Sequence, residues 1–506
     1  MNYIQNKRPF KSRYKIFPSL PALCLGIILG FAYFIYPSFC VSAFGQDDFH
    51  AGPLYDSFQL TLAPGHRTEV LGPLYYNQQS ESERTWALPP IYSHDTDPSI
   101  EMIQDDFLYP ILTYRQYGAE YRWQFIELFS FAGGEDPQEF QDVHRFTLFP
   151  IYFQQRSPLT NDNYTALVPF YGHLKERLFR DDIFFILFPI YSETRKKDVI
   201  NDNYLYPFFN VRHGDGMHGW QFWPVFGEEH KAVMTQTNGW GDVQINGGHD
   251  HSFVLWPIHF RQDNGIGTDD PEKIRANFPL EYLQRSPQRD STAVLWPFFM
   301  WIDDRGQKYR EWQMPWPIII VARGEGKTTT RVFPLFSRAH NDTFEDNFYL
   351  WPVYKFNAIH SAPLERRRTR ILFFLFQNTS DKNIETGKEK RRVDFWPFFV
   401  YHRDFEGNSR LQVIAPVETF VPDNPNVERD WSPVWSLWRA QDNVKTGAHS
   451  QSLLWNLYRR DTSPGAKKIS LLFGLFQYQS GAETKKVRLF FIPVINSHGR
   501  TAPSAN

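Results

Sequence analysis

The sequence predicts an all-β protein folded as a large antiparallel β-meander, and three observations lead to this prediction. Short apolar runs alternate with polar segments of similar length along most of the 506 residues, and the polar segments carry the Gly, Asp, Asn and Ser typical of turns. Aromatic residues make up 17% of the chain, and their rings pack well across neighbouring strands. After the N-terminal leader no apolar period typical of a long helix appears, so no large helical domain is expected.

One motif organises the apolar runs, and its clearest copy is Val294-Leu295-Trp296-Pro297-Phe298-Phe299-Met300-Trp301. Pro between aromatic or aliphatic residues recurs at Phe149-Pro150, Phe188-Pro189, Trp256-Pro257, Trp351-Pro352 and Trp396-Pro397. Because Pro has no backbone donor, it marks either a kink or bulge inside a long strand or the break between two short strands. The sequence leaves both interpretations open.

If the Pro kinks a long strand, the pattern predicts about 22 strands of about a dozen residues, joined by Gly-containing hairpin turns. The residues around the Pro, as in Trp396-Pro397-Phe398-Phe399, are apolar at successive positions. This pattern predicts burial on both faces of the sheet at mid-strand.

A longer period lies over the motif and sets the domain boundaries. Tyr109-Pro110, Tyr206-Pro207 and Trp296-Pro297 are each followed by a Trp-Gln strand, and Trp396-Pro397 is followed by a weaker copy. We predict a signal peptide or N-terminal membrane anchor, a segment with the first strands, four β super-repeats of which the fourth includes a closing strand, and a polar tail. The leader is residues 1–45 and the segment with the first strands is residues 46–106. The four super-repeats are residues 107–203, 204–291, 292–391 and 392–495, and the polar tail is residues 496–506.

Three arrangements of the strands fit the meander: a curved sheet, a propeller-like body or a barrel. Export, aromatic wealth and hairpin connections favour a transmembrane barrel. Two-sided burial, uniform loops and a polar C-terminal tail oppose it and favour a soluble repeat body. A parallel solenoid is disfavoured by the hairpin turns.

The N-terminus predicts export. Lys7, Arg8, Lys11, Arg13 and Lys15 form a basic leader, and Ile16–Gln46 carries no charge. A small-residue site at Val41-Ser42-Ala43 or Ala43-Phe44-Gly45 favours a cleaved signal peptide over an uncleaved anchor. Either way the body is expected outside the cytoplasm, in the cell envelope as a periplasmic or outer-membrane protein.

Charge and cysteine content exclude several classes of function. A formal net charge of −2 gives no reason to expect nucleic acid as a partner. The only cysteines, Cys24 and Cys40, lie in the leader, so the body has no disulfide and no thiolate metal site. Arg366–Arg370 and Lys388–Arg392 are either a basic rim for anionic lipid or polysaccharide, or solvated gatekeepers beside an apolar strand.

Two groups of residues are candidate binding sites. His249, Asp250 and His251 stand at the end of the longest loop and are a weak candidate metal site. The second group is Trp123, Trp220 and Trp312, each of which is followed by Gln. These rings are candidate platforms for stacking a ligand such as a sugar. Packing within the repeat is the rival explanation for these Trp residues.

No catalytic motif is present, so no enzyme activity and no cofactor are expected. The sequence predicts an exported, non-catalytic β-repeat scaffold of the cell envelope that has structural or binding roles. Membrane lipid and envelope polysaccharide are the expected partners, and the oligomeric state is left open. The alternative is an outer-membrane β-barrel channel or transport component, and a glycan-active enzyme is a more distant hypothesis.

Overall fold

The computed structural model describes residues 54–126, 128–134, 143–158, 162–237, 243–481 and 484–498. These residues all belong to one compact unit, Asp48–Asn506. The predicted leader, residues 1–45, lies outside the described residues, as does the end of the predicted polar tail.

The described residues form 45 short β-strands, two short α-helices and a 3-10 turn, η2 (Gly72–Leu74). The first strands are β1 (Asp56–Gln59), β2 (Gly65–Val70), β3 (Tyr75–Ser80), β4 (Glu83–Leu88), β5 (Tyr92–Asp97), β6 (Met102–Phe107), β7 (Leu112–Tyr117), β8 (Glu120–Phe125), β9 (Phe129–Gly133), β10 (His144–Leu148), β11 (Tyr152–Arg156), β12 (Tyr164–Leu167), β13 (Tyr171–Arg177), β14 (Arg180–Ile186), β15 (Tyr191–Lys196), β16 (Val199–Tyr204), β17 (Phe209–Gly214), β18 (Met217–Phe222) and β19 (Phe226–Lys231).

The chain continues through β20 (Met234–Thr237), β21 (Val243–Asn246), β22 (Gly248–Val254), β23 (His259–Ile266), β24 (Glu272–Asn277), β25 (Glu281–Arg285), β26 (Arg289–Val294), β27 (Phe299–Asp304), β28 (Tyr309–Gln313), β29 (Ile319–Gly324), β30 (Thr328–Val332), β31 (Phe336–His340), β32 (Phe344–Tyr349), β33 (Tyr354–Ser361), β34 (Leu364–Ile371), β35 (Phe376–Asn383), β36 (Glu389–Phe395), β37 (Phe399–Arg403) and β38 (Ser409–Val413). Helices α2 (Pro425–Asp430) and α3 (Ser432–Trp435) follow. The last strands are β39 (Trp438–Asn443), β40 (Ala448–Leu453), β41 (Tyr458–Ser463), β42 (Ala466–Leu471), β43 (Phe476–Ser480), β44 (Thr484–Leu489) and β45 (Ile492–His498).

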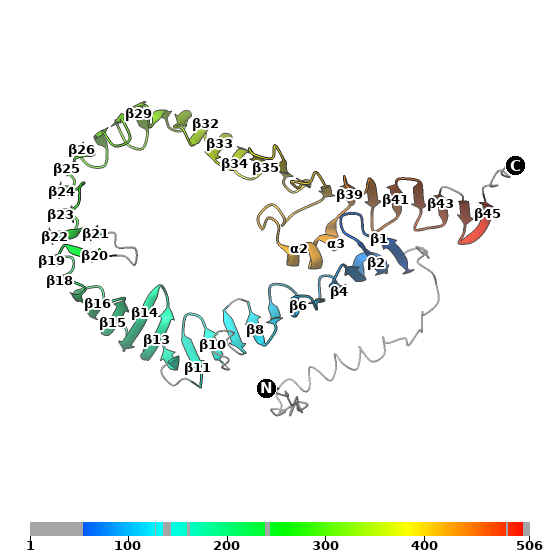
Figure 1. Ribbon diagram of the computed structural model, residues 1–506, viewed down its shortest axis with the longest axis horizontal. Coiled ribbons are helices and arrows are strands. Elements are labelled where there is room, and N and C mark those ends of the chain that lie inside the picture. Colours follow the sequence, from blue (N-terminus) through cyan, green and yellow to red (C-terminus); the bar gives the residue numbers. More distant parts are fainter. Residues whose placement is uncertain are drawn as a thin grey trace, which may run out of the picture. The chain divides into compact units, whose positions relative to one another are not determined.

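One antiparallel sheet holds 43 of these strands, and each strand pairs with its neighbours in sequence order. The exception is the hairpin β20–β21, which stands apart while β19 and β22 pair directly. Among the described strands, β1 pairs with β2 alone and β45 with β44 alone, so the sheet is not closed. The prediction of an all-β meander is confirmed, and the arrangement is one curved open sheet (Figure 1), neither a barrel nor separate propeller blades.

The predicted strand number is wrong, because the Pro motif is a turn and not a kink. Trp296-Pro297 and Phe298 connect β26 to β27, and the corresponding motifs connect other strand pairs. The Trp296-Pro297 peptide bond is cis, as in most of these turns. A Pro in a turn removes no hydrogen bond from the sheet, so the motif recurs without interrupting the pairing. Each predicted long strand is therefore two short ones.

The predicted burial on both faces around the Pro is also wrong, because these residues are exposed in turns. Phe298 and Phe398 are each 52% exposed. The buried residues lie further along the strands on one face, where small side chains lie between large ones across neighbouring strands. Phe153, Ala166, Gly172 and Phe185 are successive cross-strand partners in such a row.

The helices contact the first strands of the meander from a connection near its C-terminal part. The segment between β38 and β39 contains α2 and α3, and its Arg429 lies among side chains of β5 and β6. The Nη1 atom of Arg429 donates to Asp95 Oδ2 at 3.1 Å, and Nε donates to Ser93 Oγ at 3.0 Å. In Figure 1 the first strands accordingly lie beside α2 and α3. We call residues 414–437 the clasp.

Candidate functional site

The connections between strands form two rows with opposite chemistry. In an antiparallel meander successive turns fall at alternate ends of the strands. Connections that leave an even-numbered strand, apart from that of β20, make up what we call the apolar edge, and all but the long clasp are short and mostly apolar. They are residues 71–74, 89–91, 108–111, 126 with 128, 149–151, 168–170, 187–190, 205–208, 223–225, 255–258, 278–280, 295–298, 314–318, 333–335, 350–353, 372–375, 396–398, 414–437, 454–457, 472–475 and 490–491.

The apolar edge exposes large hydrophobic side chains along the whole sheet. Leu205, Phe298 and Leu350 are 58%, 52% and 60% exposed. Behind the turns, the first cross-strand pair of almost every hairpin is also apolar, as in Tyr204 with Phe209 and Tyr349 with Tyr354. A continuous apolar surface of this extent is rare on monomeric soluble proteins and marks a binding surface.

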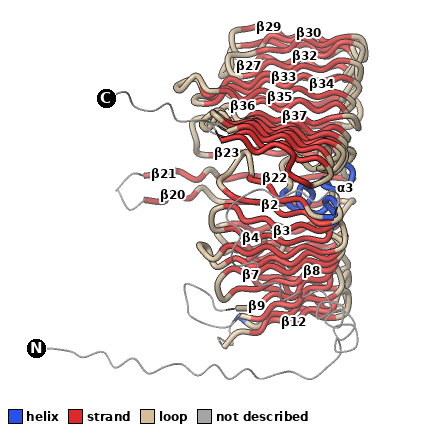
Figure 2. Tube along the Cα trace, turned by 90° about the vertical axis from the view of Figure 1, so that its right-hand side faces the viewer, coloured by secondary structure: helices blue, strands red, loops and turns tan. Residues whose placement is uncertain are grey.

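The opposite ends of the strands form a polar edge, made by the connections that leave odd-numbered strands. Examples are Lys197-Asp198, Asp215-Gly216 and residues 305–308, Arg-Gly-Gln-Lys. The β20–β21 hairpin leaves from this edge and the helices from the apolar edge, at opposite ends of the strands (Figure 2). Phe179, 96% exposed, is a large hydrophobic residue in a turn of the polar edge.

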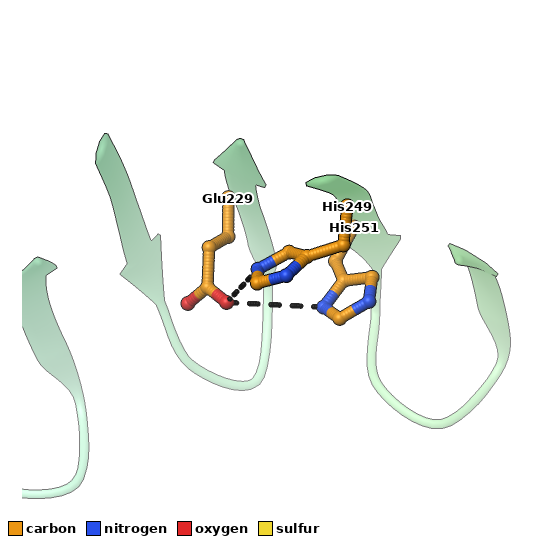
Figure 3. Close-up of side chains that lie close together, drawn as sticks. All are labelled: Glu229, His249 and His251. Carbon is orange, nitrogen blue, oxygen red and sulfur yellow. Dashed lines mark hydrogen bonds and ion pairs between the residues drawn. The ribbon is translucent and has the colours of Figure 1, made fainter. Parts of the chain in front are cut away.

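Glu229, His249 and His251 converge on one face of the sheet between the two edges. Glu229 lies on β19 and the two histidines on β22, whose positions i and i+2 point to the same face (Figure 3). Glu229 Oε1 lies 2.8 Å from His249 Nε2 and 3.8 Å from His251 Nδ1. The ligand atoms of these three described residues all lie within 4.8 Å of one another, which is close enough for them to share a metal ion.

Neighbouring side chains orient all three residues. Arg212 Nη1 donates to Glu229 Oε2 at 2.6 Å, which leaves Oε1 directed at the histidines. Asn264 Oδ1 lies 2.6 Å from His251 Nε2 and accepts its proton, which holds the ring with Nδ1 towards Glu229. Burial opposes ionisation of Glu229, but Arg212 and His249 outweigh it and lower its pKa, so the carboxylate is charged at neutral pH.

The predicted metal site is therefore brought together in part. His249 and His251 meet, but Asp250 points to the other face, where it forms an ion pair with His230. The three residues are not in a loop, as the sequence suggested, but in β22. Glu229 takes the place of Asp250, and the sequence did not reveal it because the β20–β21 hairpin separates it from the histidines.

A hollow of about 230 Å³ adjoins this cluster. Its lining includes Glu229 and His251 together with Trp223 and Trp256 of the apolar edge. Gly227 also contributes to the lining and has no side chain to fill the hollow. The hollow gives solvent and small solutes access to the polar cluster.

The three predicted stacking residues lie on separate strands and do not form one site. Trp123, Trp220 and Trp312 are on β8, β18 and β28, and each is about 40% exposed. Trp220 Nε1 donates to Glu228 Oε1 at 2.9 Å, and the ring of Trp123 lies 4.6 Å from that of Tyr114. Trp312 is the cross-strand partner of Trp301. Sugar stacking on the three rings stays a prediction.

Comparison of the chain with protein-family models and with curated proteins found no match. Within the described part of the chain, no helix has both the length and the apolar character needed to cross a membrane.

Proposed function

We propose that the protein is an exported, non-catalytic β-scaffold of the cell envelope whose apolar edge rests in the surface of a lipid membrane. The observation that carries the proposal is the segregation of apolar turns to one end of the strands and polar turns to the other. Under this proposal the polar edge faces the aqueous phase.

The chemistry of the apolar edge matches a membrane interface better than a protein partner. Trp, Tyr, Phe, Leu and Ile dominate its turns, and Trp and Tyr are the residues enriched where lipid meets water. The turns and the first strand position behind them span about 5–10 Å, which is the depth to which interfacial proteins enter the bilayer surface. The predicted leader, residues 1–45, would deliver the body to that surface and either be cleaved or add an anchor.

A vesicle flotation assay tests this function. The protein beginning at Asp48 is used, so that the leader contributes nothing, with phosphatidylcholine vesicles that contain or lack phosphatidylglycerol. We expect it to float with both kinds of vesicle. The triple variant Leu205→Ser, Phe298→Ser, Leu350→Ser should lose at least tenfold in lipid affinity, because these side chains are exposed at the apolar edge.

Phe179→Ser is the matched control, because it removes a more exposed aromatic ring from the polar edge. Its flotation should equal that of the unmodified protein. Equal flotation of the triple variant and the unmodified protein would contradict the membrane proposal. Export is tested separately, by fusing residues 1–46 to a reporter enzyme that is active only outside the cytoplasm.

A further inference from the structure

We infer that Glu229, His249 and His251 form a binding site for a divalent transition-metal ion, of which Zn²⁺ is the best match. Two imidazole nitrogens and one carboxylate oxygen are the ligands that Zn²⁺ takes in sites with three protein ligands. The inference concerns a site on one face of the sheet and does not depend on the membrane proposal.

The distances suit an ion after a small adjustment. Two ligands about 2.1 Å from a tetrahedral ion lie about 3.4 Å apart. The separations from Glu229 Oε1, 2.8 Å to His249 Nε2 and 3.8 Å to His251 Nδ1, bracket this value. The imidazole rings are stacked, with centroids 4.4 Å apart and planes 16° apart. One ring must therefore turn about its Cβ–Cγ bond, and the ion replaces the proton that His249 shares with Glu229.

The surroundings of the cluster resemble the supporting shell of a metal site. Ligating histidines commonly donate their second ring nitrogen to an oxygen that fixes the ring, as His251 does to Asn264. Asn264 is itself held by Glu272, to which its Nδ2 donates at 3.0 Å. The side chains of Glu229 and His249 are 17% and 20% exposed, so an ion would be shielded but reachable from the adjoining hollow.

The position of the site in the fold gives the ion a structural role. Glu229 and His251 are direct cross-strand partners on β19 and β22, the two strands that flank the β20–β21 hairpin. An ion there would link these strands at the place where the meander is interrupted. Bound Zn²⁺ should therefore raise the thermal unfolding temperature of the protein.

The opposite face of the same strands supplies a matched control. His218 and His230 are cross-strand partners with ring centroids 4.9 Å apart, and His230 pairs with Asp250. This second group has similar composition but is more exposed, and its described side chains do not converge as the first group does.

The experiment is titration of the purified full-length protein with Zn²⁺ by calorimetry, and with Co²⁺ by visible absorption. We expect one equivalent of tightly bound Zn²⁺, and Co²⁺ bands of the intensity typical of four-coordinate sites. His251→Phe should weaken binding at least 100-fold and Asn264→Ala about 10-fold, and His230→Asn should leave it unchanged.

Two outcomes would overturn the inference. One is the absence of Zn²⁺ binding and of Co²⁺ bands in the unmodified protein at micromolar metal, a readout that needs no variant to fold. The other is binding that His251→Phe leaves intact or that His230→Asn removes. Either would assign the cluster to ordinary ion pairing between strands.

Discussion

At the scale of single residues, the sheet depends on small side chains placed beneath large ones. Gly172 lies between Ala166 and Phe185, its cross-strand partners. A Cβ atom at Gly172 would come within 2.3 Å of the Phe185 ring and 2.5 Å of Ala166 Cβ. Gly227 stands in the same relation to Phe253. The core of this single layer of strands is therefore thin, and it consists of aromatic rings packed over small residues on the neighbouring strands.

Gly172→Ala should lower the free energy of unfolding by about 1–3 kcal/mol, because the added methyl group overpacks the row beneath Phe185. Chemical denaturation measures the change. Gly481→Ala is the control: there the nearest atom to an added Cβ is 3.6 Å away, so stability should be nearly unchanged. A neutral Gly172→Ala would contradict the packing described for this row.

At the scale of elements, the clasp joins the first strands of the meander to the connection between β38 and β39 through a buried charge cluster. Arg429 of α2 bonds to Asp95, Asp106 and Ser93, and its backbone carbonyl accepts a 3.1 Å bond from Tyr76 Oη. The indole of Trp431 adds a 2.9 Å bond to the carbonyl of Tyr109. These contacts join residues more than 300 positions apart in sequence, so the clasp ties the first strands to the segment that precedes β39.

Arg429→Leu should destabilise the clasp by about 3–5 kcal/mol, because Asp95 and Asp106 would be left buried without their cation. Hydrogen exchange should then increase in α2 and in β3–β6. Arg410→Leu removes a more exposed ion pair from the same helix, that with Glu428, and should cost at most about 1 kcal/mol. Equal effects of the two variants would mean that the buried cluster does not hold the clasp.

The clasp should also respond to pH. Burial raises the pKa of Asp430 to about 6, although Arg429 opposes the shift, and burial with the nearby Asp95 raises the pKa of Glu83 to about 7. Both carboxyls bind protons more tightly in the folded than in the unfolded protein. Their contribution to stability is therefore complete below about pH 4 and is lost as the pH rises through about 6–7.

Asp430→Asn should mimic the protonated carboxyl. Compared with the unmodified protein, this variant should gain stability at pH 8 and differ little at pH 4.5 in denaturant titrations. A variant that is less stable than the unmodified protein at pH 8 would contradict the direction of the Asp430 pKa.

At the scale of the whole molecule, the strand axis separates apolar from polar chemistry. Most strands have an apolar turn at one end and a polar turn at the other, and because neighbours are antiparallel the apolar turns gather at one edge of the sheet. Exposure of this long apolar edge to water costs free energy. Contact with lipid would relieve this cost without any change in strand pairing.

Much of the fold could be predicted from the sequence, but the division into strands could not. One long kinked strand with one turn occupies the same number of residues as two short strands with two turns, so the repeat around Trp296-Pro297 fits both. The sequence suggested that His249, Asp250 and His251 lie together at the end of a loop; their place in β22, whose side chains alternate between faces, shows that His249 and His251 share a face and Asp250 does not. Glu229 and Arg429 were beyond prediction, because their partners depend on the β20–β21 insertion and on the curvature of the sheet.

The most direct test of the membrane proposal is a depth measurement at the two ends of one strand. The protein from Asp48 onwards has no cysteine, so Phe298→Cys and Gln307→Cys each accept one fluorescent label, in the apolar and polar turns that flank β27. On vesicles that carry a lipid-bound quencher, we predict strong quenching of the label at residue 298 and none at residue 307. Equal quenching of the two labels, or none at residue 298, would contradict the proposed orientation.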